Sequence, residues 1–354
     1  MKIISFASAR PNFVKLAAVH HALAAVPTCE HIIVHTGQHY DPLFSDIFFE
    51  QLKIPAPKYN LGIHGGSRED VIRQTELAAA PILKEEHPDA VLVYGDVNGA
   101  VGGAGAAAAL GITLGHVEAG LRSFDLDMPE EHNRIAIDKL SNLLFCTEQS
   151  GLDHITAEGQ TGERFLVGNT MIDTLLRMLP SVDDAELPAG LPDRFALATL
   201  HRPSNVDTPD MLRANIAFFA EIAANLPIVL PAHHRLKASM ERFGIRAPEG
   251  LFLCEPMAYL TFLRCAREAA FLLTDSGGIQ EETVLLRKRC FTLRKNTERP
   301  VTISCGSNVL IDIEKAADRE RVLAEAQNPH DPDVTIPPLW DGHAGERIAK
   351  ILLR

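Results

Sequence analysis

Short apolar segments alternate with helix-length segments along the first half of the chain. Each apolar segment is too short for a helix and lacks strict polar–apolar alternation, which indicates strands covered on both faces of a sheet. The expected strands are Lys2–Ala7, His31–His35, Ala90–Tyr94, Ile112–Val117, Asn142–Cys146 and Phe165–Val167. The expected helices are Pro11–Val26, Asp41–Leu52, Arg68–Glu86, Asn98–Leu110, Pro129–Leu140 and Gly151–Glu158. This order predicts a doubly wound parallel sheet.

The same rhythm restarts after a stretch rich in proline, glycine and acidic residues, Leu179–Asp193, which is typical of a linker. The expected strands beyond it are Phe195–Leu200, Pro227–Pro231, Leu251–Cys254, Ala270–Thr274, Cys290–Leu293 and Val309–Ile311. We therefore predict an α/β protein of two Rossmann-like, doubly wound domains, residues 1–170 and 171–341. Ligands bind beyond the carboxyl ends of such strands, so the two domains are expected to face a common cleft.

Composition narrows the class of protein. The 354 residues are 46% hydrophobic and 23% charged, which is enough chain for two cores and excludes disorder or a coiled coil. A formal charge of −12 argues against a broad nucleic-acid-binding face. The six cysteines form no CxxC pair, and no segment reaches the roughly 18 apolar residues of a membrane span. We expect a cytoplasmic protein that binds neither nucleic acid nor membranes.

A small-residue turn in the second half joins a strand to a helix. Asp275, Ser276, Gly277 and Gly278 follow the strand, and Glu282 lies in the helix after them. Such a turn lets backbone N–H groups approach a phosphate at the helix N-terminus, but an ordinary turn capped by Ser276 fits equally well. Glu282 could accept hydrogen bonds from ribose hydroxyls or simply favour the helix dipole.

Carboxylates follow apolar strands in the first half. Asp96 and Glu118 lie at the ends of two such strands, where burial and mutual repulsion would raise the pKa of at least one of them. Glu130 and Arg134 begin the next helix, and their spacing also fits an ordinary surface ion pair. A surface ion pair does not explain Asp96 and Glu118, because their neighbours in the sequence are small and apolar.

Cationic and imidazole groups follow other strands. Arg10 and Lys15 follow the first strand, while His201, His233 and Arg299 follow strands of the second half. Arginine suits bidentate contact with phosphate, and imidazoles can surround a nucleotide. Adjacent histidines such as those at 233 and 234 rarely bind one ion together, so we expect no metal site.

Taken together, these motifs resemble the non-hydrolysing UDP-N-acetylglucosamine 2-epimerases. The motifs in shared order are Arg10–Pro11 with Lys15, Gly95–Asp96, Gly115–Arg122, Pro129–Arg134, Gly168–Thr170, His201–Arg202, Thr274–Glu282 and Thr297–Pro300. The resemblance implies a GT-B-like pair of domains, with the last helix, residues 342–354, packing back on the first domain. It also implies a homodimer without a cofactor that makes precursors of cell-surface polysaccharides.

The resemblance also implies residue roles. Chemistry would fall to Asp96, Glu118, Glu130 and His201. The UDP-sugar would be held by Arg10, Lys15, Arg134, His233, Ser276, Gly277, Gly278, Glu282 and Arg299. Two departures from the family pattern stand at Ser8–Asn12 and Pro203–Asn205, and Gln38–Asp41 only partly matches the region that binds a second, regulatory UDP-GlcNAc in bacterial members.

The reaction implied is the interconversion of UDP-GlcNAc and UDP-ManNAc. The C2 proton of the sugar is not acidic, so the anomeric C–O bond must break as that proton leaves, giving UDP and a 2-acetamidoglucal. Re-addition of UDP with protonation of the opposite face completes the inversion, which requires acid and base groups on both faces. The alternatives are a 2-epimerase of a modified UDP-sugar such as a 2,3-diacetamido sugar, a GT-B glycosyltransferase, or a non-catalytic UDP-sugar sensor.

Overall fold

The computed structural model describes residues 1–37 and 49–354. The expected helix Asp41–Leu52 lies mostly outside the described residues, and the motif Gln38–Asp41 lies entirely outside them. The described chain divides into two compact units. Unit 1 holds Met1–Met178 and Pro337–Arg354, and unit 2 holds Leu179–Ile336.

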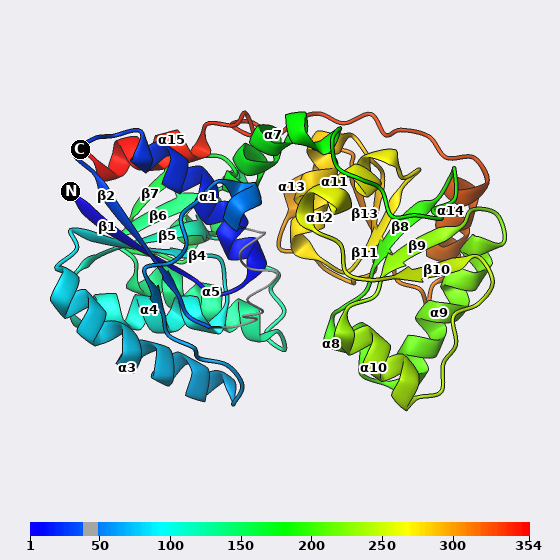
Figure 1. Ribbon diagram of the computed structural model, residues 1–354, viewed down its shortest axis with the longest axis horizontal. Helices are drawn as coiled ribbons and strands as arrows, with labels where there is room; N and C mark the ends of the chain where they lie inside the picture. The colour runs from blue at the N-terminus through cyan, green and yellow to red at the C-terminus, as the bar shows by residue number, and fades with distance from the viewer. Residues whose placement is uncertain (38–48) are drawn as a thin grey trace. The chain divides into compact units, whose positions relative to one another are not determined.

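Unit 1 is a seven-stranded sheet in the order β3-β2-β1-β4-β5-β6-β7, with every pair parallel. Its strands are β1 (Lys2–Ala7), β2 (Glu30–His35), β3 (Tyr59–Asn60), β4 (Ala90–Tyr94), β5 (Thr113–Ala119), β6 (Leu143–Cys146) and β7 (Glu163–Leu166). Its helices are α1 (Arg10–Ala24), α3 (Arg68–Glu86), α4 (Asn98–Ala109), α5 (Pro129–Leu140), α6 (Gln149–Ala157), α7 (Thr170–Val182, which crosses into unit 2) and α15 (Ala344–Leu352). Figure 1 shows these elements in chain order.

Unit 2 is a six-stranded parallel sheet in the order β10-β9-β8-β11-β12-β13. Its strands are β8 (Ala196–Thr199), β9 (Ile228–Pro231), β10 (Leu251–Cys254), β11 (Leu272–Thr274), β12 (Cys290–Thr292) and β13 (Asn308–Leu310). Its helices are α8 (Pro203–Val206), α9 (Pro209–Ala223), α10 (His234–Arg242), α11 (Tyr259–Glu268), α12 (Gly277–Leu286), α13 (Pro300–Ser304) and α14 (Ala316–Gln327).

Both sheets therefore have Rossmann-like strand order, and the predicted doubly wound α/β fold is confirmed. In each sheet the strand order reverses at one point, between β1 and β4 in unit 1 and between β8 and β11 in unit 2. Ligands of open α/β sheets bind beyond the carboxyl ends of the strands at this point. The loops after these four strands are consequently where the site residues of each unit should be sought.

Small residues let α4 lie close to its neighbours in unit 1. A Cβ at Gly103 would lie 2.9 Å from the Phe6 ring of β1, and one at Gly102 would lie 2.5 Å from the Thr75 side chain of α3. Helix and sheet enclose a core that includes Phe6, Val93 and Ala104. The glycines that break the apolar run of α4 thus serve close packing.

The C-terminal helix α15 packs on α1 within unit 1 (Figure 1). A Cβ at Gly345 would lie 2.4 Å from the Ala18 carbonyl oxygen, so the two helices touch at backbone distance. The Gly345 N–H donates to the Asp173 carboxylate at 2.7 Å, and the Trp340 ring N–H donates to the Thr147 carbonyl at 3.1 Å. The last 18 residues are thereby fixed to unit 1.

Two details of the chain differ from the sequence expectation. The two-residue strand β3 was not expected, because Tyr59–Asn60 is too short to give a pattern. Helix α7, which is not among the expected helices, runs from Thr170 to Val182 and holds Pro180, so the first residues of the expected linker are helical. The chain passes from one unit to the other after Met178 and after Ile336, and the domain limits expected from the sequence are 170/171 and 341/342.

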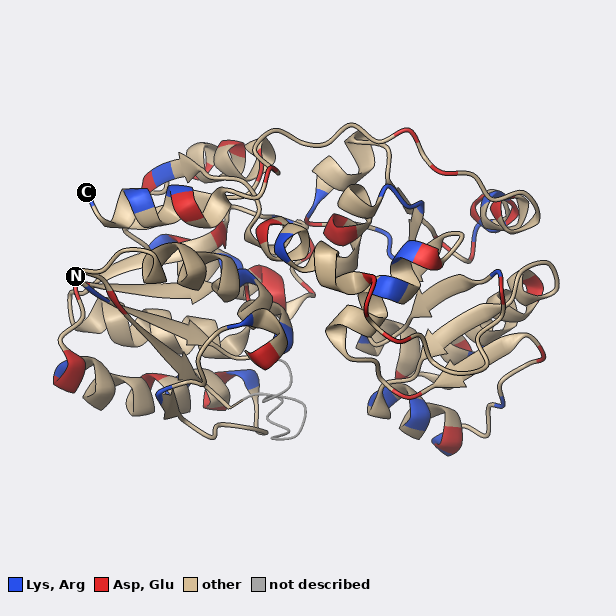
Figure 2. Cartoon of the chain, turned by 45° about the horizontal axis from the view of Figure 1, so that its top comes forward, with Lys and Arg blue, Asp and Glu red and all other residues tan. Residues whose placement is uncertain are grey.

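Charged residues of both signs are interspersed on the surface helices of each unit (Figure 2). All six cysteines lie in the described part and are free thiols. Among residues 1–37 and 49–354, no helix is both long and apolar enough to cross a membrane. Within the same residues, no group of three or more His, Cys, Asp or Glu side chains is arranged to hold a metal ion.

Candidate functional site

Glu118 occupies an unusual backbone position at the end of β5. Its φ is +76°, in the left-handed region that side chains other than glycine rarely adopt. The register between β5 and β6 shifts between Val117 and Ala119, so Glu118 is the residue that interrupts the ladder. Such irregularities re-aim a side chain at a strand end, and a conformation of this cost persists where the surroundings enforce it.

Lys15 is the ion-pair partner of Glu118. Both side chains are buried, and the Lys15 ammonium contacts the Glu118 carboxylate. A Cβ placed on Gly95, whose φ is +66°, would lie 3.0 Å from the Lys15 Nζ and 3.7 Å from the Glu118 Oε2. Glycine at position 95 therefore leaves room for this pair. Arg10, the first residue of α1, is the exposed cation of the two that follow β1.

Asn12 joins the start of α1 to the end of β4. Its Oδ1 accepts the Ala9 N–H at 2.9 Å, and its Nδ2 donates to the Tyr94 carbonyl at 2.9 Å. Asn12 belongs to the segment Ser8–Asn12 that departs from the family pattern, and it fixes the turn that presents Arg10. The Asn12 amide is buried, and it forms hydrogen bonds with backbone groups of both segments.

Asp96 and Arg134 form another ion pair at the strand ends of unit 1. The Arg134 Nη2 contacts the Asp96 Oδ2, and its Nη1 lies 2.6 Å from the Glu131 Oε2. Arg134 is buried, so its spacing from Glu130 does not make it a surface residue. Glu130 lies half-buried in the first turn of α5. Asp96 and Glu118 thus each contact a cation.

Two further residues of α5 support Asp96 and were missed by sequence reasoning. Glu131 accepts the backbone N–H groups of Ser123 and Phe124 at 2.9 and 3.0 Å. Asn133 donates from Nδ2 to the Asp96 carbonyl at 2.8 Å. Both belong to the motif Pro129–Arg134, so the signal was present, but a spacing pattern does not tell which acidic residue turns inward.

His201 and Asp275 form a dyad at the strand-order reversal of unit 2. The His201 Nδ1 lies 2.7 Å from the Asp275 Oδ1, and the His201 side chain is half-exposed. Because Nδ1 faces the carboxylate, Nε2 is the ring nitrogen left for a ligand or a proton. Asp275 also accepts the backbone N–H of Arg202 at 2.8 Å and the Asn205 Nδ2 at 3.1 Å.

Burial disfavours the ionised form of Asp275, but the hydrogen bonds that the carboxylate accepts outweigh this effect. The side chain is fully buried, yet the hydrogen bonds and charge of His201, together with the N–H of Arg202, lower the pKa of Asp275 to about 2. The carboxylate is therefore ionised at neutral pH and orients the ring of His201. Sequence reasoning noted Asp275 as part of the turn without giving it a role of its own.

The N-terminus of α12 has the features of an anion-binding turn. Ser276 is the N-cap residue, and among the described residues its side chain makes no capping hydrogen bond, so the capped-turn alternative does not hold. Gly277 and Gly278 begin the helix. A Cβ on Gly277 would lie 2.5 Å from the Arg299 Nη1, which shows how closely the guanidinium covers this turn.

The two adjacent glutamates of α12 have different partners. Glu281 contacts the Arg299 Nε at 3.1 Å, whereas Glu282 accepts the Tyr259 hydroxyl at 2.7 Å. Burial raises the pKa of Glu282 to about 7, against the opposing effect of the Tyr259 hydrogen bond and with a further contribution from Glu281. Hydrogen-bond donors from a ligand would therefore shift Glu282 toward its ionised form near neutral pH. His233 lies apart from this pair, exposed at the N-cap of α10, with its ring 3.9 Å from that of His234.

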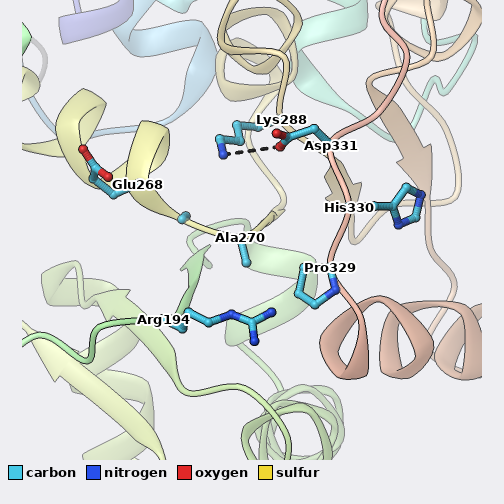
Figure 3. Close-up of a pocket in the computed structure, with 8 residues that line it drawn as sticks. Arg194, Glu268, Ala270, Lys288, Pro329, His330 and Asp331 are labelled. Atoms are coloured by element: carbon cyan, nitrogen blue, oxygen red, sulfur yellow. Dashed lines mark hydrogen bonds and ion pairs between the residues drawn. The ribbon is translucent and has the colours of Figure 1, made fainter.

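A hollow of about 240 Å³ lies at the other end of the strands of unit 2 (Figure 3). Its lining includes Arg194 before β8, Ala270 before β11 and Lys288 before β12. The ion pair between Lys288 and Asp331, at 3.4 Å, already neutralises one of its cations. The residues of the candidate site follow the opposite ends of these strands, so this hollow is separate from them.

These features define a class of protein before any comparison is made. One α/β unit carries acid–base groups at its strand ends, and the other carries an anion-binding turn, an arginine and an oriented histidine. This combination is typical of an enzyme of GT-B-like fold that acts on a nucleotide-linked substrate.

The comparisons with known proteins agree. A family model described as UDP-N-acetylglucosamine 2-epimerase matches residues 21–353. The UDP-2,3-diacetamido-2,3-dideoxy-D-glucuronate 2-epimerase of Pseudomonas aeruginosa is 39% identical, with 92% of each chain covered. The UDP-N-acetylglucosamine 2-epimerase of Methanocaldococcus jannaschii is 36% identical, with 99% of each chain covered. A crystal structure of the M. jannaschii UDP-GlcNAc 2-epimerase in complex with UDP-GlcNAc and UDP matches 100% of this chain and 99% of that one, with a TM-score of 0.92 and 35% identity. The chain belongs to the UDP-N-acetylglucosamine 2-epimerase family, and the GT-B-like fold is confirmed.

Proposed function

We propose that this chain interconverts UDP-GlcNAc and UDP-ManNAc by eliminating and re-adding UDP. The observation that carries the proposal is the pair of carboxylates at the strand ends of unit 1, Asp96 and Glu118, each held by a buried cation. An anion-binding turn alone would serve any nucleotide-binding protein. Paired acid–base groups at the ends of neighbouring strands are required by a reaction that moves protons on both faces of one carbon.

In the first half of the reaction, a carboxylate takes the C2 proton while the anomeric C–O bond breaks. The bonding electrons of C1–O leave with the β-phosphate oxygen of UDP, and a C1–C2 double bond forms in the 2-acetamidoglucal. In the second half UDP returns to C1 and an acid protonates C2 from the other face. Asp96, Glu118 and Glu130 are the groups that we assign to these proton transfers.

The proposal gives unit 2 the task of retaining UDP between the two halves. The N–H groups at the start of α12 and the Arg299 guanidinium favour a diphosphate, because both supply positive charge to its oxygens. Glu282 accepts ribose hydroxyls, and His201, oriented by Asp275, faces the leaving phosphate as an acid. Arg10 and His233 supply further positive groups. Tight retention matters because free UDP would leave the glycal to be hydrolysed.

A second substrate is favoured by one observation. The relative from P. aeruginosa, at 39% identity, acts by name on a 2,3-diacetamido uronic acid rather than on UDP-GlcNAc. The chain also departs from the family pattern at Pro203–Asn205, where Asn205 is bound to Asp275 beside His201. A modified UDP-sugar is therefore the competing substrate within the same reaction type.

Steady-state kinetics with three substrates would decide between them: UDP-GlcNAc, UDP-ManNAc and a UDP-2,3-diacetamido uronic acid. We expect the highest kcat/KM for the first two, with approach to the same equilibrium mixture from either side. Turnover of the diacetamido substrate alone would replace the proposed sugar. Consumption of UDP-GlcNAc only when an acceptor sugar is present would indicate a glycosyltransferase, and binding of UDP without turnover of any substrate would indicate a sensor.

The resemblance also supports a homodimer in solution. Sedimentation equilibrium should then give twice the chain mass of 38.7 kDa. A mass of 38.7 kDa across the working concentration range would exclude it.

A further inference from the structure

His116 on β5 is completely buried, and each of its ring nitrogens faces an acceptor. The Nδ1 lies 2.6 Å from the Asp138 Oδ1, and the Nε2 lies 2.9 Å from the Gly95 carbonyl oxygen. A neutral imidazole has one N–H and one lone pair, so it can donate to only one of two such acceptors. The other nitrogen would then set its lone pair against that of an oxygen.

Neither acceptor can reverse its role. A carbonyl oxygen has no hydrogen to donate, and Asp138 is held in its ionised form. Its Oδ2 accepts the Arg122 guanidinium at 2.7 Å and the Gly120 N–H at 3.2 Å. Two fixed acceptors require a ring that carries both protons.

We propose that His116 is held as an imidazolium and is the positioning residue for the Gly95–Asp96 turn. This proposal rests on the proposed function only for the catalytic role of Asp96. The turn is held at three backbone points. The Gly95 N–H donates to the Val117 carbonyl at 3.0 Å, the Gly95 carbonyl accepts His116, and the Asp96 carbonyl accepts Asn133.

The charge–assisted bond from His116 is the strongest of the three, because the donor is ionised. It holds a glycine in a left-handed conformation, φ +66°, on the residue directly before Asp96. A rotation of that peptide would move the Asp96 carboxylate away from its position beside Arg134. His116 thus acts on the reaction through the placement of Asp96.

The surrounding charges make a buried imidazolium tolerable. Asp138 from α5 faces its Nδ1, Arg122 binds the same Asp138, and Glu158 after α6 binds Arg122 at 2.7 Å. Two positive and two negative groups thereby balance. Helix α4, which packs on β5 and α5, holds no ionisable side chain, and burial raises the pKa of Cys146 on β6 to about 12, so that thiol stays neutral.

The charge state can be read in the wild-type protein. In the full chain labelled with ¹⁵N-histidine, NMR should show one ring with both nitrogens protonated and in slow exchange from pH 6 to 8.5. His116→Gln assigns that signal, and Asp138→Asn, which removes its counter-ion, assigns it independently if the first variant fails to fold. A His116 ring with only one protonated nitrogen at pH 7.5 would overturn the proposal.

Kinetics test the positioning role. We expect His116→Gln to lower kcat about 10²-fold with KM little changed, as for a misplaced catalytic group. Asp138→Asn should add a loss of turnover with rising pH, because the ring then loses its proton within the tested range. His132→Gln, which changes an exposed histidine of α5, is the matched control and should keep wild-type rates.

Two results would contradict the positioning role: an Asp138→Asn pH profile identical to that of wild type, or an unchanged kcat in His116→Gln. If wild type fails to epimerise any UDP-sugar, the proposed function falls, and NMR of the ring still decides the state of His116.

Discussion

The two units share the Rossmann-like strand order but carry different groups at the same edge of their sheets. In unit 1, Asp96 follows β4 at the strand-order reversal and Glu118 lies at the end of the neighbouring strand β5, and a buried cation contacts each. In unit 2 the corresponding loops carry His201 and Asp275, and the carboxylate is taken up by donors that orient the histidine. We therefore assign proton transfer to this edge of the sheet in unit 1 and anion retention to the same edge in unit 2.

The difference teaches what charge pairing does at such an edge. Nearby cations favour the ionised forms of carboxylates, which suits groups that must accept a proton. Glu282 shows the contrasting case, because burial raises its pKa to about 7 and its ordered partner is the neutral Tyr259 hydroxyl. The ionised form of such a carboxylate is stabilised most when a bound ligand supplies further hydrogen-bond donors.

The largest effect is expected in unit 1. Asp96→Asn and Glu118→Gln each remove a group that we assign to proton transfer, and turnover should fall about 10²–10⁴-fold. UDP affinity, which we assign to unit 2, should change little. Rates from NMR of the sugar nucleotides and calorimetry with UDP measure the two quantities separately.

Glu69→Gln, an exposed carboxylate of α3, is the control for these variants. It should leave both turnover and UDP affinity as in wild type. Near-native turnover in either site variant, with its fold intact, would make that carboxylate structural. A large loss of UDP affinity with native turnover would contradict the assignment of proton transfer to unit 1 and of UDP binding to unit 2.

The next effect concerns Glu282 in unit 2. We expect Glu282→Gln to weaken UDP binding by one or two charge-assisted hydrogen bonds, about 1.5–3 kcal/mol each. Ribose hydroxyls favour the ionised form, so wild type should release a proton on binding UDP below pH 7 and bind more tightly as pH rises through about 7. Calorimetry in two buffers of different ionisation enthalpy measures that proton. Glu282→Gln corrects for protons lost by UDP itself, and equal proton release in both proteins would remove Glu282 from the site.

The smallest effect is acid sensitivity confined to unit 1. The Nδ1 atoms of His20 and His31 lie 3.0 Å apart, and burial lowers the pKa of His31 to about 3 and that of His20 to about 4. Both are neutral in the folded state but protonate near pH 6.5 when unfolded. Their contribution to stability is therefore complete above pH 6.5 and is lost as pH falls toward 4.

Trp340, the single tryptophan, is buried in unit 1 and reports its unfolding. His31→Gln should move the acid transition of Trp340 fluorescence to lower pH, because about 1–2 kcal/mol of pH-dependent destabilisation at pH 5 disappears. His343→Gln, an exposed histidine of the same unit, should leave the transition in place. Coincident transitions for wild type and His31→Gln would contradict the assignment.

Much of the fold could be predicted from the sequence because buried parallel strands leave a clear apolar pattern. The limits of β1, β4 and β10 agree with the expected segments, as do those of α3 and α5. The strand β3 and the helix α7 were not predicted from the sequence. The first is only two residues long, and the second ends beyond Pro180, in a stretch whose composition indicates a linker.

The candidate site could be predicted as a set of strand-end residues but not as a set of partners. The positions of Asp96, Glu118 and His201 follow from the ends of their strands. Which cation meets which carboxylate depends on backbone geometry, such as the left-handed Glu118, that no sequence pattern carries. Asp275 and His116 were missed as functional groups for the same reason, because their roles lie in what they contact.

Solvent-proton exchange at C2 tests the central claim most directly. In deuterium oxide, wild type should convert UDP-GlcNAc and UDP-ManNAc into each other, and proton NMR should show loss of the C2 signal in the product as deuterium enters from an exchangeable carboxylate. Asp96→Asn and Glu118→Gln should slow deuterium entry and epimerisation together. Epimerisation with full retention of the original C2 hydrogen would contradict proton removal by these strand-end carboxylates.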